Sequence, residues 1–271
     1  MSKKLIISID GGGIRGIIPL VVLRSIQFRL KKNLDKICAS WYGTSTGSVI
    51  AAGLLIQQEK LFADAIQNVL DIYEFRSKSS INPLGASNPA RALNKILDEN
   101  FAPFTFTEFQ KLNVVASRLP NFEAAIFNTT NNVNLAAALK ASCAVPGIFD
   151  SVKIGADSYV DGFLAAKNPA ALALQNETLD ENLILLSLGT GILRTKDEVE
   201  NHVKKTHEDL TLLSQKQGFH YYRINPRLDL AADDMQNTNL KNIFNLKKDT
   251  ENHLKEKSEK IADLIKLIEK I

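Results

Sequence analysis

The chain has 271 residues, of which 45% are hydrophobic and 23% charged, and its formal net charge is +3. This length and composition exclude a largely disordered chain and predict one large domain, or one domain with a small extension. The mild charge gives no reason to expect nucleic-acid binding, but it is compatible with contact to an anionic membrane surface. Cys38 and Cys143 lie in apolar surroundings without metal-site spacing, so we expect two reduced core cysteines.

No targeting segment is evident near the N-terminus. The apolar run Leu5–Ile9 is too short for the hydrophobic region of a signal peptide, and it ends at Asp10. No stretch approaches the length of a transmembrane helix. We therefore expect a cytoplasmic or peripheral membrane protein.

Strand, glycine turn and helix alternate in the first part of the chain. Leu5–Ile9 is predicted to be a buried strand, and a glycine-rich turn leads from it into a helix over 17–32. A strand over 37–42, a turn over 43–47 and a helix over 48–57 repeat the pattern. This order predicts an α/β fold of three layers, with a mostly parallel central sheet flanked by helices.

Shorter elements follow. Asn88-Pro89 has the form of a helix N-cap with proline in the first turn, and Thr105–Glu108 matches a capping box. Further strands are predicted at 114–117, 123–127, 158–160 and 183–188, and an alanine-rich helix at 135–144.

The composition becomes polar after about Thr195. The last stretch, 250–271, carries apolar residues on one helical face, at Ile261, Leu264, Ile265, Ile268 and Ile271. We expect a helix docked on the body of the protein. The alternative is a helix that binds a membrane surface or a partner, which its lysines would suit. The predicted organisation is a domain over 1–230 and a helical C-terminal extension over 231–271.

The segment Gly43-Thr44-Ser45-Thr46-Gly47 is a G-x-S-x-G between a predicted strand and a predicted helix. In that position the pattern makes a nucleophile elbow, a strained turn that exposes the serine hydroxyl. The helix that follows points the positive end of its dipole at the serine, which favours developing negative charge. A purely structural turn is the alternative.

A second glycine-rich turn occupies residues 10–16. Its consecutive glycines expose N–H groups that can converge on an anion. One candidate is a nucleotide phosphate, because Gly11, Gly13 and Gly16 form G-x-G-x-x-G. The other is the oxyanion of a tetrahedral acyl intermediate. Asp35 precedes the next strand instead of ending it, which argues against a dinucleotide site. A candidate nucleophile at the next strand turn favours the oxyanion.

A serine hydroxyl needs a base to act as a nucleophile near neutral pH. The usual histidine is poorly supported, because none of the four lies at a strand end: His202, His207, His220 and His253. A carboxylate acting directly on the serine is the other solution. Asp161 is the best candidate, since it ends a strand-like run and precedes Gly162. Asp10, Asp150 and Asp157 are weaker, and Asp10 is better placed to brace the glycine loop.

Three motifs in order, residues 10–16, 43–47 and Asp161-Gly162, resemble those of the patatin-like phospholipase family. Segments 141–149, 168–169, 187–191 and 222–226 resemble further family segments, so the resemblance spans roughly residues 5 to 230. That family uses a Ser–Asp dyad without histidine. Two positions depart from its pattern. Ser48 stands where glycine is usual, and Phe163 stands where the family has Gly or Ala. Neither change removes a reacting atom.

The resemblance implies that Ser45 is the nucleophile and Asp161 the general base. It also implies an oxyanion hole and supporting residues: Gly11, Gly12, Gly13 and Thr46 for the oxyanion, and Arg15, Gly43, Gly47 and Gly162 as support. Arg15 would anchor the loop or contact anionic head groups. The expected function is a lipid acyl hydrolase of the phospholipase A or esterase type, with a lipid substrate and neither metal nor organic cofactor.

Two alternatives remain. The first is an acyltransferase on the same scaffold, although Thr44 occupies the place where malonyl-type transferases carry histidine. The second is a non-catalytic lipid-binding regulatory protein, although Ser45, Asp161 and the glycine loop are all intact. The need for an activator or a partner protein stays open.

Overall fold

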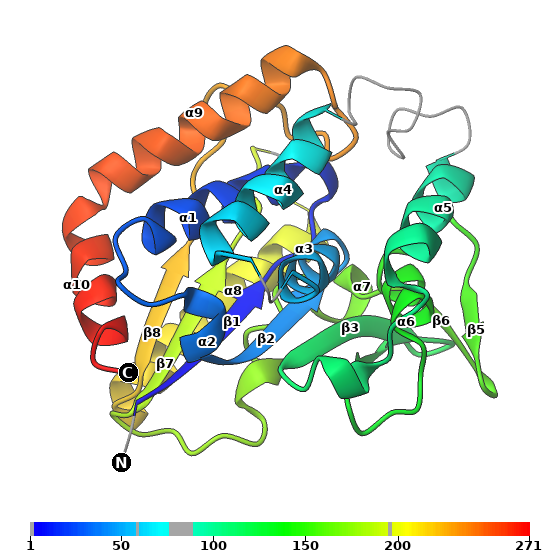
Figure 1. The fold of residues 1–271 in the computed structure, drawn as a ribbon, viewed down its shortest axis with the longest axis horizontal. Helices are drawn as coiled ribbons and strands as arrows, with labels where there is room; N and C mark the ends of the chain where they lie inside the picture. The colour runs from blue at the N-terminus through cyan, green and yellow to red at the C-terminus, as the bar shows by residue number, and fades with distance from the viewer. Residues whose placement is uncertain (1–2, 58–59, 76–88, 195–196) are drawn as a thin grey trace.

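The computed structural model describes residues 3–57, 60–75, 89–194 and 197–271 (Figure 1). An eight-stranded sheet forms the centre, in the order β5-β6-β3-β2-β1-β7-β8 with β4 paired to β3. Its strands are β1 (Lys4–Ile9), β2 (Cys38–Thr44), β3 (Leu112–Arg118), β4 (Glu123–Phe127), β5 (Val152–Ile154), β6 (Asp157–Asp161), β7 (Leu183–Leu188) and β8 (His220–Ile224). Strands β1, β2, β3, β7 and β8 are parallel, and β4, β5 and β6 run antiparallel to their neighbours.

Helices cover both faces of this sheet (Figure 1). They are α1 (Ile17–Gln27), α2 (Leu34–Ile37), α3 (Thr46–Leu55), α4 (Phe62–Phe75), α5 (Pro89–Phe101), α6 (Leu135–Ser142), α7 (Phe163–Ala166), α8 (Glu198–Gln217), α9 (Leu240–Glu256) and α10 (Ser258–Ile268). Strand β1 contributes side chains to both helical layers, because successive side chains of a strand point to opposite faces of the sheet. Leu5 and Ile7 join the core beneath α1 and α9, whereas Ile6 packs with Leu210 of α8. The predicted three-layer, mostly parallel α/β fold is confirmed.

One edge of β3 determines where the candidate site forms. Strand β4 pairs with the whole of Val114–Arg118, so β2 and β6 must share the opposite edge of β3. Strand β2 ends with Thr44 opposite Val115, and β6 takes over with Asp161 opposite Ala116. The end of β2 therefore meets the end of β6. This arrangement places Ser45, the residue after β2, next to Asp161.

Some predicted boundaries differ from the observed ones. Helix α1 ends at Gln27 instead of residue 32, because the Gln27 side chain accepts a hydrogen bond from the Leu34 N–H (2.8 Å) and donates one to the Lys32 carbonyl (3.3 Å). These bonds stabilise a turn where helix was expected. The helix at Pro89 and the capping box at Thr105 are confirmed, whereas the proposed cap Asn88 lies outside the described residues.

The C-terminal region forms two helices where one was predicted. Helices α9 and α10 meet at Lys257, and Figure 1 shows α9 running beside α1 and α10 turning away from its end. The predicted apolar face is buried at Ile261, Leu264, Ile265 and Ile268. These residues belong to the same core cluster as β1, so the last helix docks on the body of the protein. The predicted domain boundary at residue 230 stays a prediction.

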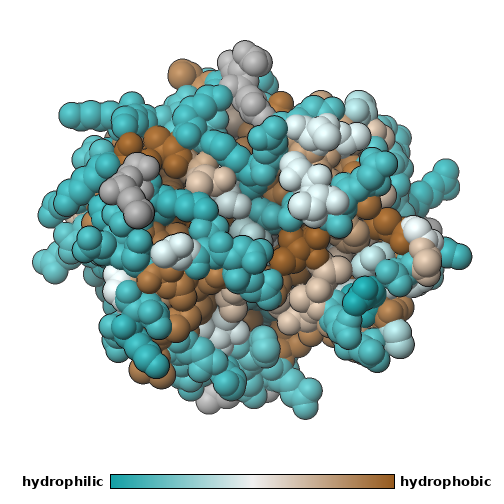
Figure 2. Space-filling view, turned by 90° about the horizontal axis from the view of Figure 1, so that it is seen from below, coloured by the Kyte–Doolittle hydropathy of each residue, from teal (hydrophilic) through white to brown (hydrophobic). Residues whose placement is uncertain are grey.

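Within the described residues, no helix combines the length and hydrophobicity required to cross a lipid bilayer. Figure 2 shows the face seen from below Figure 1, where the parallel strands begin. Hydrophilic residues cover most of this face, and hydrophobic residues lie between them.

Candidate active site

Ser45 lies at the sharp turn between β2 and α3. Its backbone angles, φ 53° and ψ −124°, fall in a region that residues other than glycine rarely adopt. Holding a serine there costs on the order of 1–3 kcal/mol. The turn also needs glycine at position 47, because a Cβ there would lie 2.3 Å from the carbonyl oxygen of Ile9. The G-x-S-x-G motif thus forms a strained elbow.

Two further serines hold this elbow in place. The Ser45 N–H donates to the hydroxyl of Ser142 (2.9 Å), which in turn donates to the carbonyl of Val115 in β3 (2.6 Å). The Ser48 hydroxyl lies 2.7 Å from the Ser45 carbonyl oxygen and 3.1 Å from Ser142 Oγ. Sequence reasoning assigned no role to Ser142, and it noted Ser48 only as a departure from the family pattern. Both serines tie the nucleophile turn to β3.

Asp161 is completely buried at the end of β6. Its Oδ1 accepts a hydrogen bond from the Phe163 N–H (2.9 Å), while Oδ2 is buried without a hydrogen-bond partner among the described residues. Burial raises the pKa of Asp161 to about 7, although the Ser45 hydroxyl and the Phe163 N–H both act to lower it. A carboxylate with that pKa can accept a proton near neutral pH.

The glycine loop after β1 presents backbone donors beside Ser45. The Gly11 N–H is engaged, because it donates to the Lys167 carbonyl at 3.0 Å. The predicted role of Gly11 as an oxyanion donor stays a prediction, since in this structure its N–H already has an acceptor. No hydrogen bond within the described residues uses the N–H groups of Gly12, Gly13 or Thr46. Of these three residues, Gly12 lines the cavity that holds Ser45, described below.

Asp10, the residue before the glycine loop, is held in place by Arg223. Both of its carboxylate oxygens accept hydrogen bonds from the buried guanidinium of Arg223, at 2.8 and 2.5 Å. The same guanidinium donates to the hydroxyl of Ser187 in β7 (2.7 Å). A bidentate buried pair fixes geometry more strongly than an exposed one. Asp10 is therefore engaged in a buried ion pair, and it does not line the cavity that holds Ser45.

Arg15 is buried beneath the loop, where its Nε donates to the Gly12 carbonyl (3.3 Å). Its Nη1 is buried without a hydrogen-bond partner among the described residues. Burial lowers the pKa of Arg15 to about 10, against the opposing effect of nearby carboxylates such as Asp233. The guanidinium stays charged near neutral pH and anchors the glycine loop.

One cavity of about 260 Å³ brings these groups together. It is lined by Gly11, Gly12, Arg15, Ser45, Val145, Asp161, Phe163, Lys167, Leu193, Asp197, Val199, Glu200, Asp233 and Met235. None of the four histidines lines it, and neither do Asp10, Asp150 or Asp157. Three supporting glycines permit close backbone packing around it, since an added Cβ would lie within 2.4 Å of a backbone atom at Gly43, Gly47 and Gly162.

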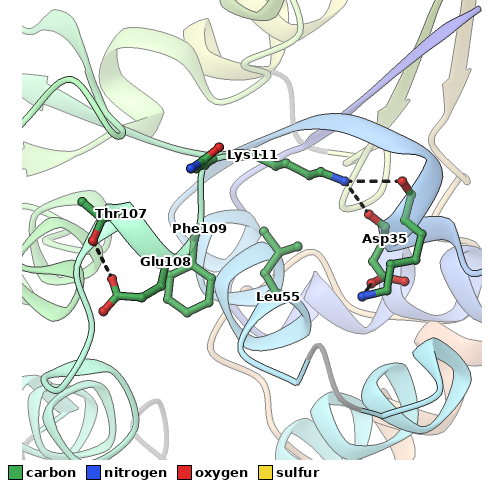
Figure 3. Close-up of a pocket in the computed structure, with 8 residues that line it drawn as sticks. Asp35, Leu55, Thr107, Glu108, Phe109 and Lys111 are labelled. Atoms are coloured by element: carbon green, nitrogen blue, oxygen red, sulfur yellow. Dashed lines mark hydrogen bonds and ion pairs between the residues drawn. The ribbon is translucent and has the colours of Figure 1, made fainter.

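Asp35 lies at the end of the sheet where β2 begins, opposite to the end that carries the glycine loop and Ser45. It belongs to α2, which precedes β2, whereas the glycine loop follows the end of the parallel strand β1. Figure 3 shows it in a separate pocket of about 220 Å³, where Lys111 donates to the Asp35 and Lys36 carbonyls at 3.0 and 3.4 Å. Asp35 is therefore not placed to bind the ribose of a dinucleotide whose phosphates are held by the glycine loop. This placement excludes a dinucleotide site built from Asp35 and that loop.

The sequence model of the patatin-like phospholipase family matches residues 7–174. A parallel sheet with a serine elbow beside a buried carboxylate defines a protein of the nucleophile-elbow class. The match covers more than half of the chain, and the chain belongs to the patatin-like phospholipase family.

Relatives of this chain carry phospholipase names. The "Intracellular phospholipase A2" of Caenorhabditis elegans is 29% identical over 217 residues, covering 74% of this chain and 19% of the relative. The human "Calcium-independent phospholipase A2-gamma" is 28% identical, with coverage of 74% and 30%. The "cUMP-AMP-activated phospholipase" of Escherichia coli is 26% identical, with coverage of 69% and 64%. The chain thus spans between about a fifth and two thirds of these relatives.

Among solved structures, VipD from Legionella pneumophila aligns with a TM-score of 0.44 and 14% identity. The alignment covers 93% of this chain and 67% of that one.

Proposed function

We propose that this protein is a lipid acyl hydrolase of the phospholipase A or esterase type, in which Ser45 and Asp161 form a catalytic dyad. The observation that carries the proposal is the position of Asp161. Its Oδ2 is buried, lacks a hydrogen-bond partner among the described residues, and lines the same cavity as Ser45. Such a carboxylate is suited to accept a proton from the serine hydroxyl, because catalytic hydrogen bonds often tighten only when substrate is bound.

In the proposed reaction, Asp161 takes the proton from Ser45 Oγ as this oxygen attacks the ester carbonyl carbon. The tetrahedral intermediate then collapses, the acyl–oxygen bond breaks, and Asp161 returns the proton to the leaving alkoxide. Water attacks the resulting acyl-serine ester, and Asp161 accepts its proton and passes it back to Ser45. The free fatty acid and the alcohol are the products, and the enzyme is regenerated.

The oxyanion hole of this proposal consists of the N–H groups of Gly12, Gly13 and Thr46. Removal of one such donor in other enzymes slows the reaction by roughly 100- to 1000-fold. The N-terminus of α3 adds favourable electrostatic potential, since Thr46 is its first residue. Gly11 has a positioning role here, because its N–H holds the loop against Lys167.

Contact with a lipid surface is part of the proposal. Leu240 and Phe244 lie one turn apart on α9 and are 52% and 64% exposed. Lys241 and Lys248 project from the neighbouring part of the same helix, so the surface combines apolar and cationic groups. Helix α9 begins shortly after Met235, which lines the catalytic cavity. This surface would bring the cavity close to lipid esters.

The test is fatty-acid release from mixed phospholipid vesicles by the wild type, Ser45→Ala and Asp161→Asn. Asp157→Asn is the matched control, since Asp157 lies on the same strand but is exposed beside Arg118. Release by the wild type and the control alone supports the dyad. Full activity of Ser45→Ala or Asp161→Asn would refute the assignment.

The same assay separates the two alternative functions. An added alcohol acceptor that captures most of the acyl groups as a new ester would indicate an acyltransferase. If no acyl group is released, labelling with a fluorophosphonate probe reports whether Ser45 is nucleophilic. Labelling of the wild type but not of Ser45→Ala would indicate an enzyme that lacks its activator or substrate. Failure to label would favour a lipid-binding protein.

A further inference from the structure

A second cavity adjoins the catalytic one and lies between α8, the end of β8 and the junction of α9 with α10. Its volume is about 690 Å³, compared with about 260 Å³ for the cavity of Ser45. Ligand pockets for small molecules typically measure about 300–1,000 Å³. The break between α9 and α10 at Lys257 shapes one wall, since His253 and Lys260 from the two helices both line the cavity.

The lining combines aliphatic and cationic side chains. The aliphatic members are Ile192, Leu193, Val203, Ile224 and Ile261. The basic members are Lys204, His207, Arg223, His253, Lys257 and Lys260. The lysines are exposed, whereas Val203, Ile224 and Ile261 are buried. Exposed lysines thus surround an apolar interior.

The charges around this cavity are unbalanced. Glu200 is its one lining carboxylate, and it already pairs with Lys167. Lys260 lies over the ring of Tyr222, 5.9 Å from its centroid, and no carboxylate among the described residues pairs with it. Burial lowers the pKa of both His207 and His253 and so favours their neutral forms, which leaves the lysines as the source of the positive charge. The cavity therefore presents positive potential toward a ligand.

Some of these cations have partners on their own helices. Lys204 lies 3.7 Å from Glu208, and Lys257 lies 2.5 Å from Glu256. Both pairs are exposed, and such pairs contribute little and are easily exchanged. An anion bound at the opening of the cavity can therefore form ion pairs with Lys204 and Lys257 without breaking a buried interaction.

We infer that this cavity binds an anionic amphiphile, a molecule with an aliphatic chain and one terminal carboxylate or phosphate. The chain would occupy the aliphatic interior, and the anion would lie among Lys257, Lys260 and His253. A free fatty acid and a lysophospholipid share this chemistry. The choice of these two molecules rests on the proposed function, because both are products of acyl-ester hydrolysis. The cavity and its charges stand independently of that function.

The second site is linked to the catalytic cavity by shared residues. Leu193 and Glu200 line both cavities, and Glu200 pairs with Lys167, whose carbonyl accepts the Gly11 N–H. Arg223 lines the second cavity and also holds Asp10 before the glycine loop. A bound amphiphile thus contacts the groups that position the proposed oxyanion hole.

Binding can be measured without turnover in the Ser45→Ala variant. Oleate and a lysophosphatidic acid, each below its critical micelle concentration, would be titrated against a bound fluorescent fatty-acid analogue. The double variant Lys257→Glu, Lys260→Glu in the same background should weaken displacement by roughly tenfold or more. The matched control is Lys266→Glu, Lys270→Glu, which makes the same charge change at exposed positions that do not line the cavity.

A second variant, Asn201→Trp, tests the site by bulk. Asn201 is exposed and lines the cavity, so a tryptophan there would block it without altering the core. Weakened binding in both test variants, with the control unchanged, supports the inference. A comparison of oleate with lysophosphatidic acid then identifies the preferred anion.

Several outcomes would overturn the inference. Equal oleate binding by the test variants and the control would place the ligand elsewhere. Displacement only by a nucleotide such as ATP would show that the ligand class is wrong. Absence of any saturable binding would remove the site. Because these experiments use Ser45→Ala, their failure is distinct from a failure of the wild type to hydrolyse lipids, which would refute the proposed function alone.

Discussion

Replacement of Asp161 by asparagine should change the pH dependence of stability in a calculable way. Burial raises the pKa of Asp161 from its ordinary value of 3.8 to about 7. Between these values the folded chain holds a proton that the unfolded chain has lost, so the free energy of unfolding falls as the pH rises. The full penalty above pH 7 is about 4 kcal/mol. Between pH 5 and pH 8 the change is about 2.5 kcal/mol.

The assay is urea unfolding of the wild type and Asp161→Asn at pH 5 and at pH 8. Other titrating groups are common to both proteins, so the difference between the two pH changes isolates Asp161. The wild type should lose about 2.5 kcal/mol more than the variant as the pH rises. Any cost of burying the asparagine amide is the same at both pH values. Equal losses in the two proteins would mean that the pKa of Asp161 is not raised in the folded state.

Three other predictions follow from the same contacts. If deprotonated Asp161 is the base, kcat/KM in vesicle hydrolysis should rise through a pKa of about 7, and a flat profile from pH 5 to 8 would contradict this. Ser142→Ala should lower the free energy of urea unfolding by about 1–3 kcal/mol and reduce kcat, because the Ser45 N–H loses its buried acceptor. An unchanged kcat would show that the turn at Ser45 keeps its active geometry without the Ser142 hydroxyl. Phe244→Ser should reduce sedimentation with anionic vesicles, whereas Leu212→Ser, 65% exposed on α8, should not; equal behaviour of the two would refute the α9 contact.

The sequence was most informative where a backbone conformation demands particular residues. Glycine at 43 and 47 permits close approach of the chain around Ser45, and the observed φ of 53° is the strain that the motif predicts. Several buried strands were also predicted, because nearly continuous apolar runs such as Leu183–Leu188 are typical of parallel strands covered on both faces. These signals are local, so they can be read without knowing the fold.

Long-range contacts account for most of what was missed. Helix α8 reads as polar surface because only Val203, Thr206 and Leu210 are buried along it. The contact between the Gly11 N–H and Lys167 joins residues far apart in the sequence, so spacing could not reveal that this donor is occupied. The break at Lys257 could not be predicted either, because the amphipathic pattern of the sequence continues across it. The structure shows the break, since α10 packs on the core as a separate helix.

The departure at Ser48 shows how the site tolerates a change from the family pattern. A glycine there would leave the Ser45 carbonyl and the Ser142 hydroxyl without this partner, whereas the Ser48 hydroxyl lies within hydrogen-bond distance of both. Ser142 then connects the elbow to Val115 of β3, the strand whose next residue, Ala116, pairs with Asp161. The nucleophile and the proposed base are thus positioned from adjacent residues of one strand. Ser48→Gly should therefore alter kcat more than KM, because the change acts on how the reacting groups are aligned and leaves the lining of the cavity unchanged.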